Sequence, residues 1–376
     1  MSDSTPESSA GQRQEASATR SKRARFRRGR FLVWGVLIWG ALLGYPIWRL
    51  MVWSSLPSPI EWGCGLLLFF SPLICRWPLR QVSSRGARRL KQVLELPLGL
   101  LPTWWLLTVV LDLAKFFGLS NSAAVLLLAL GLFFATLRGL WQIQPRWVVH
   151  QRVLEGLSSP INIAQITDVH IGSRDPAFLA QLVRQVNQAA PDLLVITGDF
   201  IDQAGISVEQ LASLRGLSMP TYFVSGNHER YEDWDQILMR LDELGVTVLD
   251  NRVVKIREDL ELIGIEDADV EEQVGLQLKR LKVAADQCSI LLYHRPSGLE
   301  AAAEHGIALT MSGHTHAGQI TPFGWLVGRV FSRVKGWSRT GDCWHYVSEG
   351  TGTWGPALRL GTRAEMTMFQ LKPGAQ

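Results

Sequence analysis

Five short motifs in the C-terminal half of the chain combine aspartate, histidine and asparagine directly after apolar segments. They are Asp168-Val169-His170, Gly198-Asp199-Phe200, Gly226-Asn227-His228-Glu229, His294-Arg295-Pro296 and Gly313-His314-Thr315-His316. Five of the eight histidines of the chain lie in these motifs. Mixed carboxylate and imidazole ligands suit Mn, Fe or Zn better than Mg²⁺ or Ca²⁺. The set predicts a hydrolytic centre with two metal ions, which at roughly 3.5–4 Å apart can clamp a phosphoryl group for in-line displacement.

An alternation of strands and helices is expected to position these motifs. Strands are predicted at Ile161–Thr167, Asp192–Thr197, Thr221–Ser225, Leu260–Ile265, Ser289–Tyr293 and Ala308–Ser312, and helices are predicted to begin at Pro176 and Trp234. Ligands of α/β sheets collect beyond the carboxyl ends of strands, and all five motifs fall there. Glycines before the ligands, such as Gly198, permit sharp turns. The order of elements predicts an α/β protein with helices covering the faces of sheets.

Residues 158–372 resemble the calcineurin-like metallophosphoesterases, because the five motifs match that superfamily in the same order. The closer resemblance is to bacterial membrane-attached members, including proteins similar to UDP-2,3-diacylglucosamine hydrolase. It is carried by the segments Leu292–Pro296, Ser312–Ile320 and Tyr346–Gly352. Ala317 and Thr351 depart from the pattern of that subgroup without changing a ligand. The resemblance implies a four-layer αββα sandwich of two mixed sheets.

The resemblance also implies a role for each polar residue of the motifs. One metal ion would be held by Asp168, His170 and His316, the other by Asn227, His294 and His314, and Asp199 would bridge the two. His228 would not be a ligand, but would stabilise developing charge or protonate the leaving oxygen. The implied cofactors are two divalent or trivalent transition-metal ions, Mn, Fe or Zn. Asp202 and Glu229 have either supporting or purely structural roles.

The N-terminal third of the chain predicts a membrane region. Residues 1–30 carry eight Lys/Arg against three Asp/Glu and are expected to form a disordered basic tail. Residues 31–141 hold four apolar stretches that approach the ~20 residues needed to cross a bilayer. They are Phe31–Trp53, Ile60–Trp77, Val93–Ala114 and Ala123–Trp141. We therefore predict about four transmembrane helices, then a linker at 142–157 and the catalytic domain at 158–372; a buried helical core is the alternative.

The charges of the loops predict the orientation of the catalytic domain. The first connection, Ser54–Pro59, has no Lys or Arg, whereas the second carries Arg76, Arg80, Arg85, Arg88, Arg89 and Lys91. The positive-inside rule therefore places the catalytic domain on the cytoplasmic side of the inner membrane. A rival interpretation is export of the domain, because Arg27-Arg28-Gly29-Arg30-Phe31-Leu32 loosely resembles a twin-arginine signal.

The uneven charge of the chain bears on its partners. Residues 151–376 carry twenty Lys/Arg against twenty-eight Asp/Glu, whereas residues 31–150 carry ten against three. The acidic catalytic half argues against a nucleic-acid substrate, and the basic half suits an anionic membrane surface. The four cysteines lack metal-ligand spacing and predict neither a disulfide framework nor a zinc finger. Membrane lipids are the expected partners.

A basic and aromatic segment follows the last two histidines. Within it, Trp325, Arg333 and Arg339 are candidate substrate-binding residues that would face phosphate and lipid; an ordinary hairpin with a solvated face is the alternative. The expected substrate is a lipid-linked phosphodiester or pyrophosphate, such as UDP-2,3-diacylglucosamine or a phospholipid-like molecule. The rival functions are a tethered phosphodiesterase for soluble substrates and a catalytically idle membrane sensor or scaffold. The complete ligand set weighs against the idle protein.

Overall fold

A computed structural model of the chain describes residues 40–76, 84–284 and 286–374. The basic tail predicted at 1–30, the start of the first apolar stretch and the part of the second connection that holds Arg80 lie outside the described residues.

Two six-stranded mixed sheets form the centre of the C-terminal part. The first contains, in spatial order, β1 (Arg146–Leu154), β12 (Glu365–Pro373), β2 (Ile161–Ile166), β3 (Leu193–Thr197), β4 (Thr221–Val224) and β5 (Thr247–Val248). The second contains β10 (Gly336–Thr340), β11 (Cys343–Val347), β9 (Leu309–Ser312), β8 (Cys288–Leu292), β7 (Leu260–Gly264) and β6 (Arg252–Arg257). Strands β2 to β5 pair in parallel in the first sheet, as do β7, β8, β9 and β11 in the second. The six predicted strands are all present, with ends that shift by one residue.

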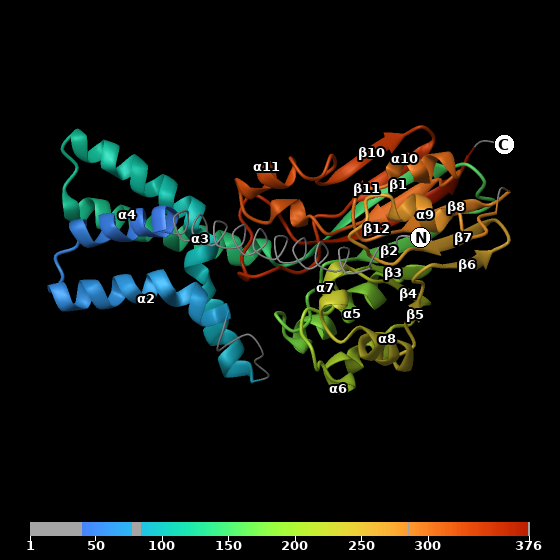
Figure 1. Cartoon of the computed structure of the whole chain (residues 1–376), viewed down its shortest axis with the longest axis horizontal. Helices are drawn as coiled ribbons and strands as arrows, with labels where there is room; N and C mark the ends of the chain where they lie inside the picture. The colour runs from blue at the N-terminus through green and yellow to red at the C-terminus, as the bar shows by residue number, and fades with distance from the viewer. Residues whose placement is uncertain (1–39, 77–83, 285, 375–376) are drawn as a thin grey trace, which may run out of the picture. The chain divides into compact units, whose positions relative to one another are not determined.

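Successive side chains of each central strand face opposite sides of its sheet, which builds the layers. In β2, Ile161 and Ile163 pack between the two sheets, whereas Ala164 and Ile166 pack against the outer helices α5 (Pro176–Ala189) and α8 (Trp234–Glu243). The outer face of the second sheet packs against α9 (Gln273–Leu278) and α10 (Leu299–Glu304). Figure 1 shows α5 and α8 on one side of the strands. The predicted four-layer αββα sandwich is therefore confirmed.

The remaining helices of the sandwich are short. They are α6 (Val208–Leu211), η1 (Ala212–Gly216), α7 (Asn227–Tyr231), η2 (His316–Gly318) and α11 (Phe323–Val327). Two of them, α7 and η2, begin at predicted functional residues and directly follow the loops after β4 and β9.

Strand β1 differs from the prediction, because it lies within residues 142–157, which the sequence assigns to a linker. It pairs in parallel with β12 from Arg146 opposite Glu365 to Leu154 opposite Pro373. Its burial pattern is mostly intermediate or exposed, as expected at the edge of a sheet. An edge strand buries only part of one face, so residues 146–154 show no clear apolar alternation that would reveal a strand.

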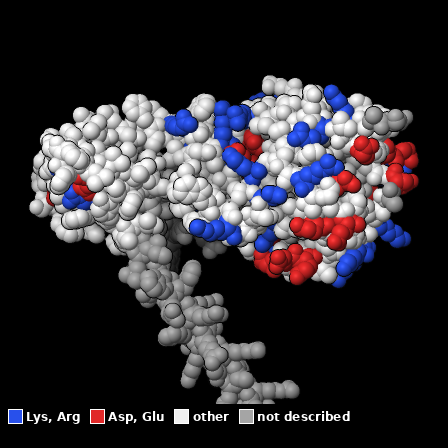
Figure 2. Space-filling model, turned by 90° about the horizontal axis from the view of Figure 1, so that it is seen from above, with Lys and Arg blue, Asp and Glu red and all other residues white. Residues whose placement is uncertain are grey.

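The N-terminal part is helical in all four predicted apolar stretches. Residues 40–53 form a helix and are followed by α2 (Ser58–Arg76), α3 (Arg85–Phe116) and α4 (Asn121–Gln142). Two stretches, Gly86–Phe116 and Asn121–Gln142, are long and apolar enough to cross a membrane, and Ser58–Ile74 is a shorter apolar helix. Figure 2 shows a surface with few charged side chains over these helices and mixed charges over the sandwich. These features favour attachment of the chain to a membrane.

Asp112 is an acidic residue in the apolar C-terminal half of α3. Asp112 accepts hydrogen bonds from Tyr45 (2.6 Å) and from Nε of Arg49 (2.8 Å), both in the helix of residues 40–53. Ionisable groups within apolar helices are costly unless they are paired. This pairing accounts for a carboxylate in a stretch that otherwise resembles a membrane span.

Helices α3 and α4 each contribute to two compact units. One unit is formed within residues 40–70 and 103–130, and the other contains the remaining described residues, including both sheets. In this second unit, Leu100 of α3 and Leu132 of α4 pack in one apolar cluster with Leu358. Gly139 of α4 permits close packing there, because a Cβ atom at this position would lie 2.3 Å from Cδ1 of Leu358. The unit that holds the sheets thus extends beyond the predicted boundaries of 158–372.

Candidate metal centre

All seven predicted ligands lie in the loops or first helical turns that follow the carboxyl ends of strands. Asp168 and His170 follow β2, Asp199 follows β3, Asn227 follows β4, His294 follows β8, and His314 and His316 follow β9. Five of them, Asp168, His170, Asp199, His314 and His316, have positive φ angles between 48° and 72°. Such conformations cost non-glycine residues about 1–3 kcal/mol each and persist at functional sites where the surroundings enforce them. The two sheets therefore hold these side chains in strained, converging positions.

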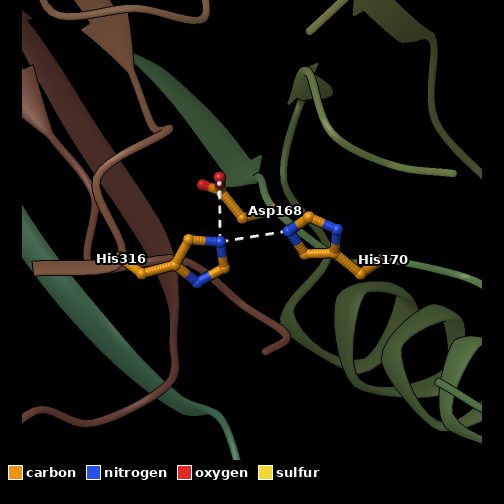
Figure 3. A group of neighbouring side chains, drawn as sticks. All are labelled: Asp168, His170 and His316. Carbon is orange, nitrogen blue, oxygen red and sulfur yellow. Dashed lines mark hydrogen bonds and ion pairs between the residues drawn. The ribbon is translucent and has the colours of Figure 1, made fainter. Parts of the chain in front are cut away.

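Asp168, His170 and His316 form the first group of donors. Nε2 of His316 lies 3.0 Å from Nε2 of His170 and 3.4 Å from Oδ1 of Asp168. All three side chains are buried, and their donor atoms point toward one another (Figure 3). On the far side of the His170 ring, Nδ1 lies 3.4 Å from Oδ2 of Asp202. A carboxylate on that nitrogen orients the ring and leaves Nε2 for a metal ion.

Asp199, His294 and His314 form the second group. Nε2 of His294 lies 3.1 Å from Oδ2 of Asp199 and 3.2 Å from Nδ1 of His314. The other ring nitrogen of His294 donates to the carbonyl oxygen of Thr197 (2.8 Å), which leaves Nε2 as the donor toward the centre. Asn227 adds a buried Oδ1 atom that has no hydrogen-bond partner among the described residues. An unpartnered buried amide oxygen on a residue that lines the same cavity as Asp199 and His314 fits a metal ion.

The electrostatics of the buried groups also fit cations. Although burial opposes it, the charge of Asp199 raises the pKa of His294 to about 10. In return, and again against burial, the charge of His294 holds the pKa of Asp199 well below its usual range. Burial raises the pKa of Asp168 and lowers that of His314 to about 3. A neutral His314 keeps a lone pair for a metal ion, and cations between Asp168 and Asp199 would offset the cost of burying both carboxylates.

Glu229 has a structural role that the sequence left open. Its buried carboxylate accepts backbone N–H groups from the loop after β3, at Asp199 (3.0 Å), Phe200 (2.6 Å) and Ile201 (2.8 Å). It also accepts the N–H of Gly226 (2.8 Å) in the loop after β4. The two loops that carry Asp199 and Asn227 are thereby joined. Gly226 is needed for this approach, because a Cβ atom there would lie 2.2 Å from Oδ1 of Asp199.

Arg359 is a buried residue of the centre that sequence reasoning missed. Its guanidinium donates to Nδ1 of His316 (3.2 Å) and to the carbonyl oxygens of Gly350 (3.2 Å) and Gly352 (2.9 Å). It therefore positions the ring of His316 from the side opposite to Asp168. The available signal was a single charged residue in the apolar run Ala357-Leu358-Arg359-Leu360.

His228 lies at the open side of the centre. Its side chain is 21% exposed, and its Nε2 atom lies 4.0 Å from Oδ2 of Asp199. Its backbone N–H donates to Oδ1 of Asp199 (2.9 Å). Burial, reinforced by His170, lowers the pKa of His228, so its imidazole is neutral at neutral pH. His228 also groups with His170 and Asp202 as a further set of donors that could hold a metal ion, which leaves two roles for it.

A cavity of about 520 Å³ opens over the centre. The centre contributes Asp199, Asn227, His228 and the rings of His170, His314 and His316 to its walls. Its volume falls within the range of about 300–1,000 Å³ that is typical of small-molecule sites. The donor groups therefore face a space in which a substrate can bind.

The predicted substrate-binding residues Trp325, Arg333 and Arg339 are not among the described residues that line this cavity. Trp325 is 77% exposed on α11, and Arg339 pairs with Asp342 (2.8 Å). Phe323 and Val327 of α11 line the cavity instead. Their i, i+4 spacing was the signal in the sequence, because residues at this spacing share one face of a helix.

Comparisons with known proteins agree with this geometry. A family model described as calcineurin-like phosphoesterase matches residues 161–318. A Helicobacter pylori (strain J99) protein described as an uncharacterized metallophosphoesterase is 33% identical over 267 residues, which cover 66% of this chain and 71% of that protein. A Bos taurus protein described as a transmembrane protein with metallophosphoesterase domain is 36% identical over 242 residues, covering 56% of this chain and 53% of that protein.

Among solved structures, a crystal structure of a Thermus thermophilus protein matches 50% of this chain and 89% of that chain, with 15% identity and a TM-score of 0.34. The Helicobacter pylori relative and the family model together show the family. The chain belongs to the calcineurin-like metallophosphoesterases, and its two clusters of Asp and His side chains are the metal-binding groups of that family.

Proposed function

We propose that this metal-dependent phosphoesterase is attached to a membrane and cleaves a phosphodiester or pyrophosphate bond of a lipid-linked substrate. The observation that carries the phosphoesterase assignment is the convergence of two donor groups on one cavity, with Asp199 next to both His294 and His228. The finer proposal on the substrate is supported by the apolar helices and by the surface around the cavity.

In the proposed reaction, the residues of the chain hold the metal ions, orient the substrate and assist the leaving oxygen. Asp168, His170 and His316 would hold one transition-metal ion, Asn227, His294 and His314 the other, and Asp199 both. When bound, two such ions supply Lewis-acid stabilisation of the charge on the phosphoryl oxygens. His228 borders the cavity with a neutral imidazole, which can donate a hydrogen bond to the leaving oxygen.

The surface beside the cavity supports a substrate in a membrane. Trp325 and Val330 are 77% and 76% exposed, and Trp354, which lines the cavity, is 56% exposed. Arg329 and Arg333 follow α11 in the same segment. Exposed aromatic and aliphatic side chains beside basic ones are typical of segments that lie in the membrane interface. UDP-2,3-diacylglucosamine and phospholipids both combine the phosphate and acyl chains that such a surface would meet.

A double variant tests the lipid-linked substrate. Trp325→Ser with Arg333→Ser is expected to lower turnover of a phospholipid-like substrate in vesicles at least about tenfold, since loss of an aromatic anchor and a charge weakens binding to the interface. Turnover of bis(p-nitrophenyl) phosphate should stay within about twofold. The measurements are release of p-nitrophenol from bis(p-nitrophenyl) phosphate and of the phosphomonoester product from the lipid, both by the full-length protein loaded with Mn²⁺.

Arg339→Ser is the matched control, because the guanidinium of Arg339 is held by Asp342 and lies over the Trp344 ring. Equal losses on both substrates in the double variant would indicate a folding role. Unchanged lipid turnover would favour the tethered enzyme for soluble substrates. Failure of the wild type to hydrolyse any phosphoester when loaded with metal would favour the sensor or scaffold.

The catalytic domain is proposed to face the cytoplasm. The start of α3 carries Arg85, Arg88, Arg89 and Lys91, whereas the connection before α2 has no Lys or Arg. A green fluorescent protein fused after Gln376 in bacterial cells should fluoresce, and alkaline phosphatase at the same position should be inactive. Alkaline phosphatase fused after Leu56 is the control and should be active. An active alkaline phosphatase after Gln376 would reverse the topology and support export of the domain.

A further inference from the structure

The cavity over the metal centre has two chemically different walls. One wall carries the donor groups and His228. The other is apolar and consists mainly of Leu98, Ile320, Phe323, Val327, Phe331 and Trp354, which we call the chain slot. The two walls meet at the centre, because the ring of Phe331 packs edge-on against the ring of His314 with centroids 5.0 Å apart.

The polar side chains beside the chain slot already form hydrogen bonds within the protein. The hydroxyl of Thr315 donates to the carbonyl oxygen of Val334 (2.5 Å). Nε2 of Gln319 donates to the carbonyl oxygens of Trp354 (2.9 Å) and Pro356 (3.1 Å), and its Oε1 accepts the N–H of Trp354 (2.9 Å). A sugar or a nucleobase in the slot would find these groups occupied and would lose its hydrogen bonds to water. A hydrocarbon chain has no hydrogen bonds to lose.

The slot also includes a residue from outside the sandwich. Leu98 belongs to α3, whose stretch Gly86–Phe116 is one of the two that are apolar and long enough to cross a membrane. The part of α3 that holds Leu98 belongs to the same compact unit as both sheets. Leu100, two residues after Leu98, holds this part of α3 in that unit, because Leu100 packs with Ile320 and Leu358 in one buried cluster. The wall beside the metal centre is therefore completed by this helix.

We propose that the chain slot binds one aliphatic chain of the substrate while its phosphoryl group lies at the metal ligands. This inference rests on the proposed phosphoesterase function and narrows its substrate class to phosphoesters that carry an unbranched alkyl or acyl chain near the reacting phosphate. The total volume of about 520 Å³, shared with the phosphoryl group, is in the range for a single small ligand. Leu98 and Phe331 would then contact the chain, and Trp354 would cover it at the exposed edge.

The test is a calorimetric titration of the full-length protein, loaded with Zn²⁺ in lipid nanodiscs, with n-alkyl phosphates from butyl to decyl. Each buried methylene contributes up to about fourfold in affinity, so decyl phosphate should bind at least about a hundredfold more tightly than butyl phosphate. In Leu98→Trp, which fills the slot, this difference should fall below about tenfold. Leu90→Trp is the matched control, because Leu90 lies on the same helix and is 51% exposed. Leu90→Trp should show the same chain-length dependence as the wild type. Partitioning of the probes into the bilayer affects both variants equally, so it does not explain a difference between them.

The outcomes distinguish a failure of the chain slot from a failure of the proposed phosphoesterase function. An affinity that does not depend on chain length, or equal losses in Leu98→Trp and Leu90→Trp, would overturn the slot. So would tighter binding of adenosine monophosphate than of decyl phosphate, which would assign the apolar wall to a nucleobase. If the affinity rises with chain length in the wild type and in Leu90→Trp but not in Leu98→Trp, the slot is supported. This holds even if the protein does not hydrolyse bis(p-nitrophenyl) phosphate. That failure would count against the phosphoesterase function alone.

Discussion

Replacing Asp199 by alanine is expected to lower phosphodiester turnover at least about a thousandfold and to reduce binding at both metal sites. A single electrostatic contact in an active site contributes about 10²–10³ to the rate, and Asp199 is the residue proposed to hold both metal ions. Its carboxylate is buried, lies 3.1 Å from Nε2 of His294 and accepts the backbone N–H of His228. The measurement is turnover of bis(p-nitrophenyl) phosphate together with metal content by mass spectrometry.

Asp192→Ala is the control for this substitution. Asp192 directly precedes the same strand, β3, at the end away from the centre, where it accepts the backbone N–H of Asn162 (2.6 Å). This variant should keep its metal content and turnover. Turnover close to that of the wild type in Asp199→Ala would show that the two donor groups are not one catalytic centre.

Replacing His228 by alanine is expected to lower turnover of an alkyl phosphodiester about 10²–10⁴-fold while two metal ions remain bound. His228 lies at the open side of the centre, whereas His294 is fully buried with both ring nitrogens engaged, by Thr197 and Asp199. His294→Ala should therefore lose metal as well as activity. Metal content measured beside turnover separates a proton donor from a ligand.

The alternative role of His228 makes this comparison decisive. His228, His170 and Asp202 have donor atoms within 4.8 Å of one another, so His228 is also able to complete a metal site. Equal loss of metal in His228→Ala and His294→Ala would assign it as a ligand. A further comparison uses substrates with leaving groups of different pKa. If His228 protonates the leaving oxygen, its removal should slow an alkyl ester much more than a nitrophenyl ester, because a nitrophenolate leaves without a proton.

The sequence alone was sufficient to locate the Asp and His residues that cluster at the centre and to predict the central strands. Each of these is encoded locally. In β3, Leu193 and Val195 face one side of the sheet and Leu194 and Ile196 the other, and the run ends at Gly198 and Asp199. A buried strand must be apolar on both faces, and a ligand at its end needs a turn. Both features can therefore be predicted from a few adjacent residues. The interpretation of α5 succeeded for the same reason, since Asp175 caps the helix and Pro176 begins it.

Only the tertiary structure placed the residues that depend on distant partners. Strand β1 exists because it pairs with β12, more than 200 residues later in the chain. Arg359 reaches His316, and Leu98 reaches the cavity, through contacts that leave no periodic trace in the sequence around them. The left-handed backbone of Asp168 and His170 is likewise held by the neighbouring loop, through hydrogen bonds to Gly198 and Asp199, because this conformation is uncommon even for Asp and His, which are enriched in it. Local patterns record which face of an element is buried, but the identity of the surface that covers it is decided only when all layers pack together.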